Sequence, residues 1–318
     1  MTHVPVMLAE VVAALEPRPG RILVDATFGG GGYSRALLAA GSRVIGIDRD
    51  PEAVQRGRDL AAEEPRFTML AGSFGNLETL LVGAGVPTVD GIVFDLGLSS
   101  FQLEDSARGF AFTRDGPLDM RMAGEGPSAA DLVNGLEAEE LARILHRYGE
   151  EPAARRIARA IVARRRRQPL TRTAELAELV AGVAGGRRRR HHPATRTFQA
   201  LRIAVNDELG ELERGLEAAL RVLAPGGRLV VVAFHSLEDR LVKRFLDLHS
   251  GYRAGTSRHR PEPPRARPLL APLGRRVIRP GSEEIARNPR ARSARMRVAR
   301  KLDAEEGEAE PHGWRRAA

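Results

Sequence analysis

Three aspartates, Asp25, Asp48 and Asp95, each stand at the end of a short apolar run, and four glycines at positions 29–32 follow the first of them. Glycine lets the backbone come close to a ligand, and a helix that starts after such a turn offers free N–H groups. A carboxylate that ends the second strand of such a fold can accept hydrogen bonds from ribose hydroxyls. The glycine turn together with Asp48 therefore predicts a nucleoside-containing ligand.

The glycine turn also indicates which nucleoside. A dinucleotide loop needs a third glycine three residues after the second, and here Ser34 or Arg35 stands in that place, which disfavours a dehydrogenase. The spacing Asp25, Gly29, Gly31 is instead typical of S-adenosylmethionine-dependent methyltransferases. The cationic sulfonium and amino group of that cofactor favour nearby carboxylates. The simpler alternative for Asp25 and Asp95 is the capping of turns by their own side chains.

Two loops carry the candidate catalytic residues. Asp95 and Gln102 could accept the N–H bonds of an exocyclic amine, whose lone pair is delocalised into its ring and which must lose a proton late in methylation. His235 follows the fifth expected strand and could hold the target base or shuttle a proton. We take Asp95 and His235 as the catalytic candidates. Alternatively, Ser236 simply caps the next helix, with Asp239 at the third helical position.

Strands that alternate with helices must position these residues. This pattern predicts a parallel sheet covered by helices on both faces. After residue 104 the pattern changes to apolar residues at helical spacing, which predicts a helical insertion of about a hundred residues. The expected strands are 21–29, 43–48, 67–70, 89–96, 228–234, 277–278 and 296–302, and the expected helices outside the insertion are 34–40, 51–62, 198–223 and 237–249.

Positive charge is concentrated in two blocks. The 318-residue chain carries a net charge of +9, yet residues 143–196 hold 15 Arg against 4 acids and residues 253–301 hold 15 basic residues against 3 acids. Such blocks indicate a polyanionic partner. Because 48 of the 50 basic residues are Arg, a coding bias weakens arguments from arginine chemistry but leaves the clustering unexplained. Phosphate contacts are predicted for Arg164, Arg165, Arg166, Arg167, Arg187, Arg188, Arg189 and Arg190.

Other features limit the class of protein. The chain has no Cys, which excludes disulfides and cysteine-based zinc sites. It contains no apolar run of the roughly 20 residues that span a membrane, and its start lacks the pattern of a secretory signal. A cytoplasmic protein without a membrane association is therefore expected. His191 and His192 are adjacent rather than spaced as ligands on one helix face, so no metal site is expected.

Read together, several strings resemble the bacterial small-subunit (16S) ribosomal RNA cytosine-N4 methyltransferases of the MraW type. The strings lie in order along nearly the whole chain, and 115–121, 192–202 and 234–240 are the most specific. The complete set comprises residues 3–8, 25–34, 46–51, 94–102, 108–110, 115–121, 148–151, 192–202, 234–240 and 288–293.

The resemblance implies a fold and a donor site. The fold is α/β, a Rossmann-like class I S-adenosylmethionine methyltransferase sheet with an inserted all-helical domain. We expect a discontinuous core (1–104 and 200–302), a basic substrate-recognition insertion (105–199) and a disordered tail (303–318). Tyr33 departs from the family, which usually has His there, so a side-chain contact at this position would differ. The implied donor-binding residues are Gly31, Gly32, Tyr33, Asp48, Phe74, Asp95 and Gln102.

The resemblance also implies the reaction, which is methylation of the N4 amine of one cytidine in the decoding region of 16S ribosomal RNA. The expected partner is the small ribosomal subunit, with no obligatory protein partner. One alternative is an amino-methyltransferase of DNA, but such enzymes typically have two prolines after the fourth strand, where this chain reads Asp95-Leu96-Gly97-Leu98. The other alternative is a non-catalytic RNA-binding assembly factor, which would leave the glycine turn unexplained.

Overall fold

The computed structural model describes residues 5–184, 192–251, 267–274, 276–303 and 305. The chain divides into two compact units. Unit 1 comprises Met1–Gly97 and Glu211–Ala318, and unit 2 comprises Leu98–Gly210. Within these described ranges, no helix is long and apolar enough to cross a membrane. The expected tail at 303–318 falls almost entirely outside them.

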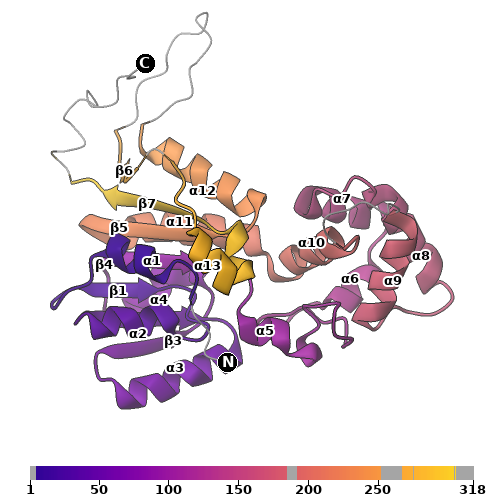
Figure 1. Ribbon diagram of the computed structural model, residues 1–318, viewed down its shortest axis with the longest axis horizontal. Coiled ribbons are helices and arrows are strands. Elements are labelled where there is room, and N and C mark those ends of the chain that lie inside the picture. The colour runs from indigo at the N-terminus through magenta and orange to yellow at the C-terminus, as the bar shows by residue number, and fades with distance from the viewer. Residues whose placement is uncertain (1–4, 185–191, 252–266, 275, 304, 306–318) are drawn as a thin grey trace, which may run out of the picture. The chain divides into compact units, whose positions relative to one another are not determined.

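Unit 1 is built on a seven-stranded sheet in the order β3-β2-β1-β4-β5-β7-β6 (Figure 1). Strands β1 to β5 run parallel, whereas β7 is antiparallel to both of its neighbours. The predicted parallel sheet is therefore confirmed, with an antiparallel addition at one edge. The strands are β1 (Ile22–Asp25), β2 (Arg43–Asp48), β3 (Phe67–Ala71), β4 (Val89–Asp95), β5 (Leu223–Ala233), β6 (Leu270–Pro272) and β7 (Arg295–Lys301).

Helices cover both faces of this sheet. The neighbouring residues Val93 and Phe94 of β4 point to opposite faces, and both are completely buried. Strands that are buried on both faces read as continuous apolar runs, which is why their sequence signal is strong. The helices are α1 (Leu8–Leu15), α2 (Gly32–Ala39), α3 (Pro51–Glu63), α4 (Leu77–Gly83), α11 (Glu208–Val222), α12 (Ser236–His249) and α13 (Ser282–Arg287), with short 3-10 turns at Phe74–Asn76 and Pro289–Ser293.

Unit 2 is helical (Figure 1). It has its own apolar core. Leu145, Ile157, Leu176 and Leu201 come from four different helices and are fully buried in that core. In the described part of this unit, strand-type pairing is limited to an isolated bridge between Pro117 and Arg172. The helices are α5 (Ser100–Glu104), α6 (Ala129–Gly135), α7 (Ala138–Gly149), α8 (Ala154–Arg165), α9 (Thr173–Ala184) and α10 (Thr195–Asn206), with a 3-10 turn at Ser106–Arg108.

The single long helix expected over 198–223 is wrong. Two helices, α10 and α11, meet at Asp207, whose φ of 46° lies in the left-handed region and interrupts the helix. An aspartate tolerates this conformation better than most residues do. Apolar residues continue at helical spacing through the break, so periodicity alone could not locate it.

The strand expected at 277–278 is also wrong. The sixth strand is Leu270–Pro272, which pairs with β7, and Ile278 makes only an isolated bridge to Met296. A three-residue edge strand that contains proline has little sequence signature, because proline cannot donate to a strand ladder.

Candidate active site

The three predicted aspartates end three neighbouring strands. Asp25 ends β1, Asp48 ends β2 and Asp95 ends β4, and these strands pair in parallel. The carboxyl ends of parallel strands share one edge of the sheet, where ligands of open α/β folds bind. Thr27 ties the first loop to the fourth strand, because its Oγ1 accepts a hydrogen bond of 2.7 Å from the Asp95 backbone N–H.

Asp25 supports the loop from inside. Its side chain is completely buried and accepts hydrogen bonds from Ser34 Oγ at 2.8 Å and from the Thr27 backbone N–H at 3.4 Å. Burial raises the pKa of Asp25 from 3.8 to about 6, and the nearby Asp48 adds to the increase. These contacts are the turn-capping alternative that the sequence left open for this residue.

Asp48 faces the glycine turn. Its Oδ2 accepts from the Gly29 backbone N–H at 2.8 Å, and its Oδ1 accepts from the Asp50 backbone N–H at 2.9 Å. Burial raises the pKa of Asp48, and these two hydrogen bonds oppose the increase. Each carboxylate oxygen can accept more than one hydrogen bond. Asp48 can therefore hold the turn and accept from ligand hydroxyls at the same time.

Two glycines of the turn are required by the protein's own side chains. A Cβ on Gly31, whose φ is 75°, would lie 2.7 Å from the Phe28 ring, and a Cβ on Gly32 would lie 2.0 Å from Pro5 Cγ. Both distances are impossible for real side chains. Close approach of a ligand is therefore not needed to explain these positions, contrary to the simplest interpretation of a glycine-rich loop.

Tyr33 connects the turn to the start of the chain. Its ring is buried with 3% exposure, and its hydroxyl donates a hydrogen bond to the Val6 backbone carbonyl. Burial raises the pKa of Tyr33 well above its usual value, and the carboxylates of Asp95 and Asp25 act in the same direction. The tyrosine hydroxyl therefore stays protonated and serves as a donor.

Phe74 lies in the 3-10 turn after β3 and is held by contacts with β4 and α11. Its ring meets Phe94 edge-on with 5.5 Å between ring centroids, and a Cβ on Gly215 of α11 would lie 2.8 Å from it. The Glu211 carboxylate accepts from the Gly75 backbone N–H at 3.0 Å and also from the Ser73 hydroxyl. Sequence reasoning missed Glu211, because it stands in an ordinary amphipathic helix.

Asp95 has a polar atom with no partner. Its Oδ1 is buried and makes no hydrogen bond to any described residue. Burial raises the pKa of Asp95 well above 3.8, and repulsion from Asp25 and Glu238 adds to the increase. A buried polar atom without a partner carries a cost in free energy, and such atoms often mark a functional site. A donor or a cation placed beside Asp95 would remove that cost.

His235, and not Ser236, is the N-cap of α12, so the predicted cap is wrong by one position. Its Nδ1 accepts from the Glu238 backbone N–H at 3.4 Å, and its Nε2 lies 3.0 Å from Glu238 Oε1. The buried Glu238 also accepts from the backbone N–H groups of Phe234 at 2.8 Å and His235 at 3.1 Å. Glu238 therefore fixes the loop after β5, and the imidazole is part of that arrangement.

Gln102 belongs to unit 2 and takes part in the N-terminal cap of α5. Ser99 is the N-cap of α5, and its Oγ accepts from the Gln102 backbone N–H at 3.2 Å. In return, Gln102 Oε1 accepts from the Ser99 backbone N–H at 3.1 Å. This reciprocal pair is a capping box, which orders the segment that follows the fourth strand.

The four described arginines of the basic cluster differ in what they contact. Arg165 donates to the backbone carbonyls of Val133 at 2.9 Å and Leu136 at 2.6 Å, so it closes the carboxyl end of α6. Arg164 donates to the Gln168 backbone carbonyl at 2.7 Å. Arg166 and Arg167 are exposed. The other predicted cluster, Arg187 to Arg190, lies outside the described residues.

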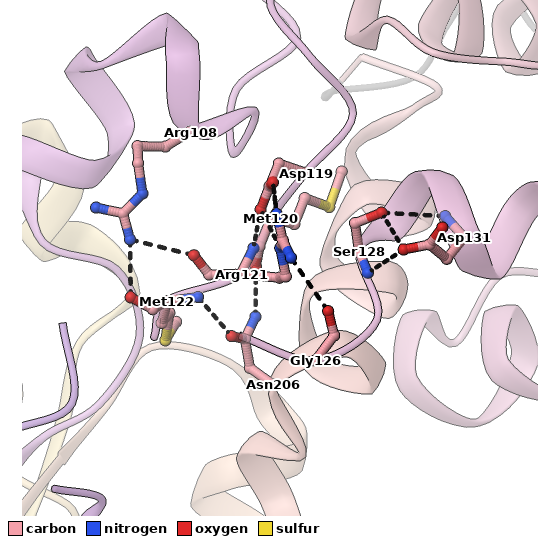
Figure 2. A network of polar contacts seen from close by, with 9 residues as sticks. All are labelled: Arg108, Asp119, Met120, Arg121, Met122, Gly126, Ser128, Asp131 and Asn206. Atoms are coloured by element: carbon pink, nitrogen blue, oxygen red, sulfur yellow. Dashed lines mark hydrogen bonds and ion pairs between the residues drawn. The ribbon is translucent and has the colours of Figure 1, made fainter. Parts of the chain in front are cut away.

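A polar network in unit 2 was not expected from the sequence (Figure 2). Asn206 Nδ2 donates to the Met120 backbone carbonyl at 2.7 Å, and Asn206 Oδ1 accepts from the Met122 backbone N–H at 2.8 Å. Met120 has a φ of 64° and a fully buried side chain. Arg121 pairs with Asp119 at 2.6 Å. The sequence pointed to this loop only through the family-like residues 115–121, and it indicated no role for Asn206.

The fold is Rossmann-like and of the class I methyltransferase type. Three features define it: the doubly wound parallel sheet, the glycine turn after β1, and the acids that end β1, β2 and β4. The sequence model of the MraW methylase family matches residues 1–302. The chain belongs to the MraW methylase family.

Curated relatives are similar over nearly the whole chain. "Ribosomal RNA small subunit methyltransferase H" of Paramagnetospirillum magneticum is 57% identical over 93% of this chain and 95% of its own. The protein of the same name from Rhodospirillum centenum is 57% identical over 95% of this chain and 93% of its own. That from Rhodospirillum rubrum is 52% identical over 98% of both chains.

Proposed function

We propose that this protein transfers a methyl group from S-adenosylmethionine to the exocyclic N4 amine of a cytidine in the decoding region of small-subunit (16S) ribosomal RNA. Membership of a methylase family and relatives named for the small ribosomal subunit support this function. The observation that carries the chemistry is the unpartnered, buried carboxylate oxygen of Asp95 at the ligand-binding edge of the sheet.

The donor fits the residues that are present. Asp48 supplies carboxylate oxygens for ribose hydroxyls, and Asp95 supplies an unsatisfied acceptor for a cationic group. We propose Gly31, Gly32, Tyr33, Asp48, Phe74, Asp95 and Gln102 as the donor-binding set. Gly32 and Tyr33 act there through the shape of the turn, since a Cβ on Gly32 would meet Pro5 and the Tyr33 hydroxyl is bonded to Val6. The bound donor supplies an electrophilic methyl group.

The protein's own contribution is to orient the amine and to take up its proton. An amine conjugated to a base becomes a better nucleophile when an acceptor holds its N–H bond. Asp95 has an acceptor oxygen for this, and we propose it as the catalytic residue. His235, the second candidate, acts in this proposal as a positioning residue, because its Nδ1 caps α12 by accepting from the Glu238 backbone N–H.

We assign RNA binding to exposed arginines of unit 2. Arg166 and Arg167 are exposed and are therefore the best described candidates for phosphate contacts. Arg164 and Arg165 donate hydrogen bonds to backbone carbonyls of the protein itself, so fewer of their N–H groups are left for phosphates.

Methyl transfer to unmethylated small subunits tests the proposal. The protein is incubated with labelled S-adenosylmethionine and either small subunits, free ribosomal RNA or DNA, and the nucleosides are separated and identified by mass. We expect N4-methylcytidine from small subunits. Label that appears only in DNA, or no label in any cytosine amine, would contradict the proposal.

A matched pair of aspartate variants isolates the donor site. Asp48→Ala removes the acceptor at the end of β2, and we expect it to lose donor binding and methylation together. Asp59→Ala changes an exposed aspartate of α3 that bonds only Gln55 among the described contacts, and we expect wild-type behaviour. Equal activity of the two variants would remove Asp48 from the donor site.

A further inference from the structure

Residues 5–7, which we name the N-terminal strap, make three separate contacts within unit 1. Pro5 is buried against Gly32, with its Cγ 2.0 Å from the place a Cβ would occupy. The Val6 carbonyl accepts a hydrogen bond from the Tyr33 hydroxyl. The Met7 backbone N–H donates to Glu284 Oε1 at 2.7 Å. The proposed uptake of the amine proton by Asp95 uses none of these contacts, although Gly32 and Tyr33 belong to the proposed donor-binding set.

The strap is held in one conformation. Met7 has a left-handed φ of 54°, and its side chain is completely buried. A bulky residue keeps such a conformation only where its surroundings enforce it. The three contacts supply that enforcement from two elements far apart in sequence, α2 and α13.

The strap lies on the first turn of α2. Gly32 and Tyr33 are the first two residues of that helix, and they directly follow the glycine turn. On its other side the turn is fastened to Asp48 through the Gly29 N–H at 2.8 Å and to Arg56 through the Gly29 carbonyl at 3.2 Å. The strap therefore adds to the hydrogen bond between Ser34 and Asp25 in restraining the helix side of the glycine turn.

We propose that the N-terminal strap is part of the donor site, and that Tyr33 and Glu284 are positioning residues that hold it against Gly32. The inference rests on the proposed function, because it assigns this restraint to binding of S-adenosylmethionine. A glycine-rich turn has many accessible conformations, and restraining it beforehand lowers the entropy lost when a ligand binds. Loss of the restraint weakens donor binding and leaves the chemical step unchanged.

Tyr33→Phe removes only the hydroxyl that bonds Val6. At saturating RNA substrate we expect the KM for S-adenosylmethionine, and the Kd for S-adenosylhomocysteine measured by calorimetry, to rise roughly five- to tenfold, as one buried hydrogen bond implies. We expect kcat to stay within about twofold. Amide exchange of residues 6–8 should become faster. Tyr33→His, which keeps a donor, should recover part of the affinity.

Substitutions of Glu284 provide an independent test of the strap. Glu284→Gln keeps an oxygen that can accept from the Met7 N–H, whereas Glu284→Ala removes it. We expect the glutamine variant to bind donor as the wild type does and the alanine variant to show the Tyr33→Phe pattern. Tyr148→Phe on α7 is the control tyrosine and should change neither donor affinity nor amide exchange of residues 6–8.

The outcomes separate the two proposals. Faster exchange of the strap with unchanged donor Kd in Tyr33→Phe would overturn the inference, since the strap would then be structural only. An equal fall in kcat and kcat/KM would also overturn it. Failure of the wild-type protein to bind either S-adenosyl compound would reject the proposed function instead, and the exchange measurement would still report whether Tyr33 holds the strap.

Discussion

Ser34 Oγ donates a hydrogen bond of 2.8 Å to the completely buried carboxylate of Asp25, and so joins the first strand to the helix after the glycine turn. Burial raises the pKa of Asp25 from 3.8 to about 6. The folded protein then binds this proton more tightly than the unfolded chain does. Stability therefore falls as the pH rises through the interval between these two values, by roughly 3 kcal/mol in all.

Asp25→Asn should remove this pH dependence. The amide oxygen can still accept from Ser34, but the side chain no longer carries a buried charge. We expect the variant to be more stable than the wild type at pH 7.5, with a smaller difference at pH 4, when urea unfolding is followed at several pH values. Asp59→Asn, an exposed change, should leave the pH profile as it is. A wild-type stability that rises between pH 4 and 6 and is unaffected by Asp25→Asn would contradict the prediction.

Donor binding should release protons from Asp95. Burial and the neighbouring carboxylates raise the pKa of Asp95, which favours its protonated form in the free protein. A cationic ligand beside it favours the ionised form, so the proton leaves on binding. The binding enthalpy should therefore differ between buffers of low and high ionisation enthalpy. Asp95→Asn should lose that difference, and a wild-type enthalpy that is independent of buffer would contradict the prediction.

His235 should affect stability through its cap. His235→Ala leaves the Glu238 N–H without its partner and should destabilise the protein by about 1 kcal/mol in urea unfolding. Asparagine is a good N-cap, so His235→Asn should restore stability. We expect this variant to keep activity within about tenfold of the wild type, because we propose only a positioning role for the ring. A loss of more than about 100-fold at normal stability would instead indicate proton transfer by His235.

Substitutions of neighbouring arginines at the carboxyl end of α8 should affect different properties, namely RNA affinity for Arg166 and Arg167 and stability for Arg165. Arg166→Ala with Arg167→Ala should lower RNA affinity and flatten the plot of log K against log salt by about one unit for each phosphate that is no longer neutralised, with stability unchanged. Arg165→Ala should instead destabilise unit 2 by about 2 kcal/mol, because two carbonyls at the end of α6 lose a charged partner. A salt slope that does not change in the double variant would mean that Arg166 and Arg167 are only solvated.

The alternation of strands and helices in unit 1 could be predicted because its parallel strands are buried on both faces. Buried strands leave apolar runs such as residues 92–94, and the runs of β1, β2 and β4 each end at an aspartate of the proposed site. Asp25, Asp48 and Asp95 were found in this way. Their different roles could not be predicted, since the contacts that distinguish them come from Ser34, Gly29 and distant Glu238.

The missed features depend on contacts that the local sequence pattern does not show. The break at Asp207 leaves the apolar spacing intact, and it is supported by bonds from Asn206 to Met120 and Met122. The cap at His235 depends on Glu238, which sequence patterns cannot distinguish from Asp239 one residue later. The sequence shows the glycines at 31 and 32, but the contacts with Phe28 and Pro5 that require them are visible only in the folded protein.

The Asn206 side chain joins the last turn of α10 to the loop at 120–122, so two distant parts of unit 2 are bonded to each other (Figure 2). The unit is therefore closed on itself near the point where the chain returns to the sheet. Because unit 2 also has an apolar core of its own, we expect residues 98–210 to fold when they are expressed alone.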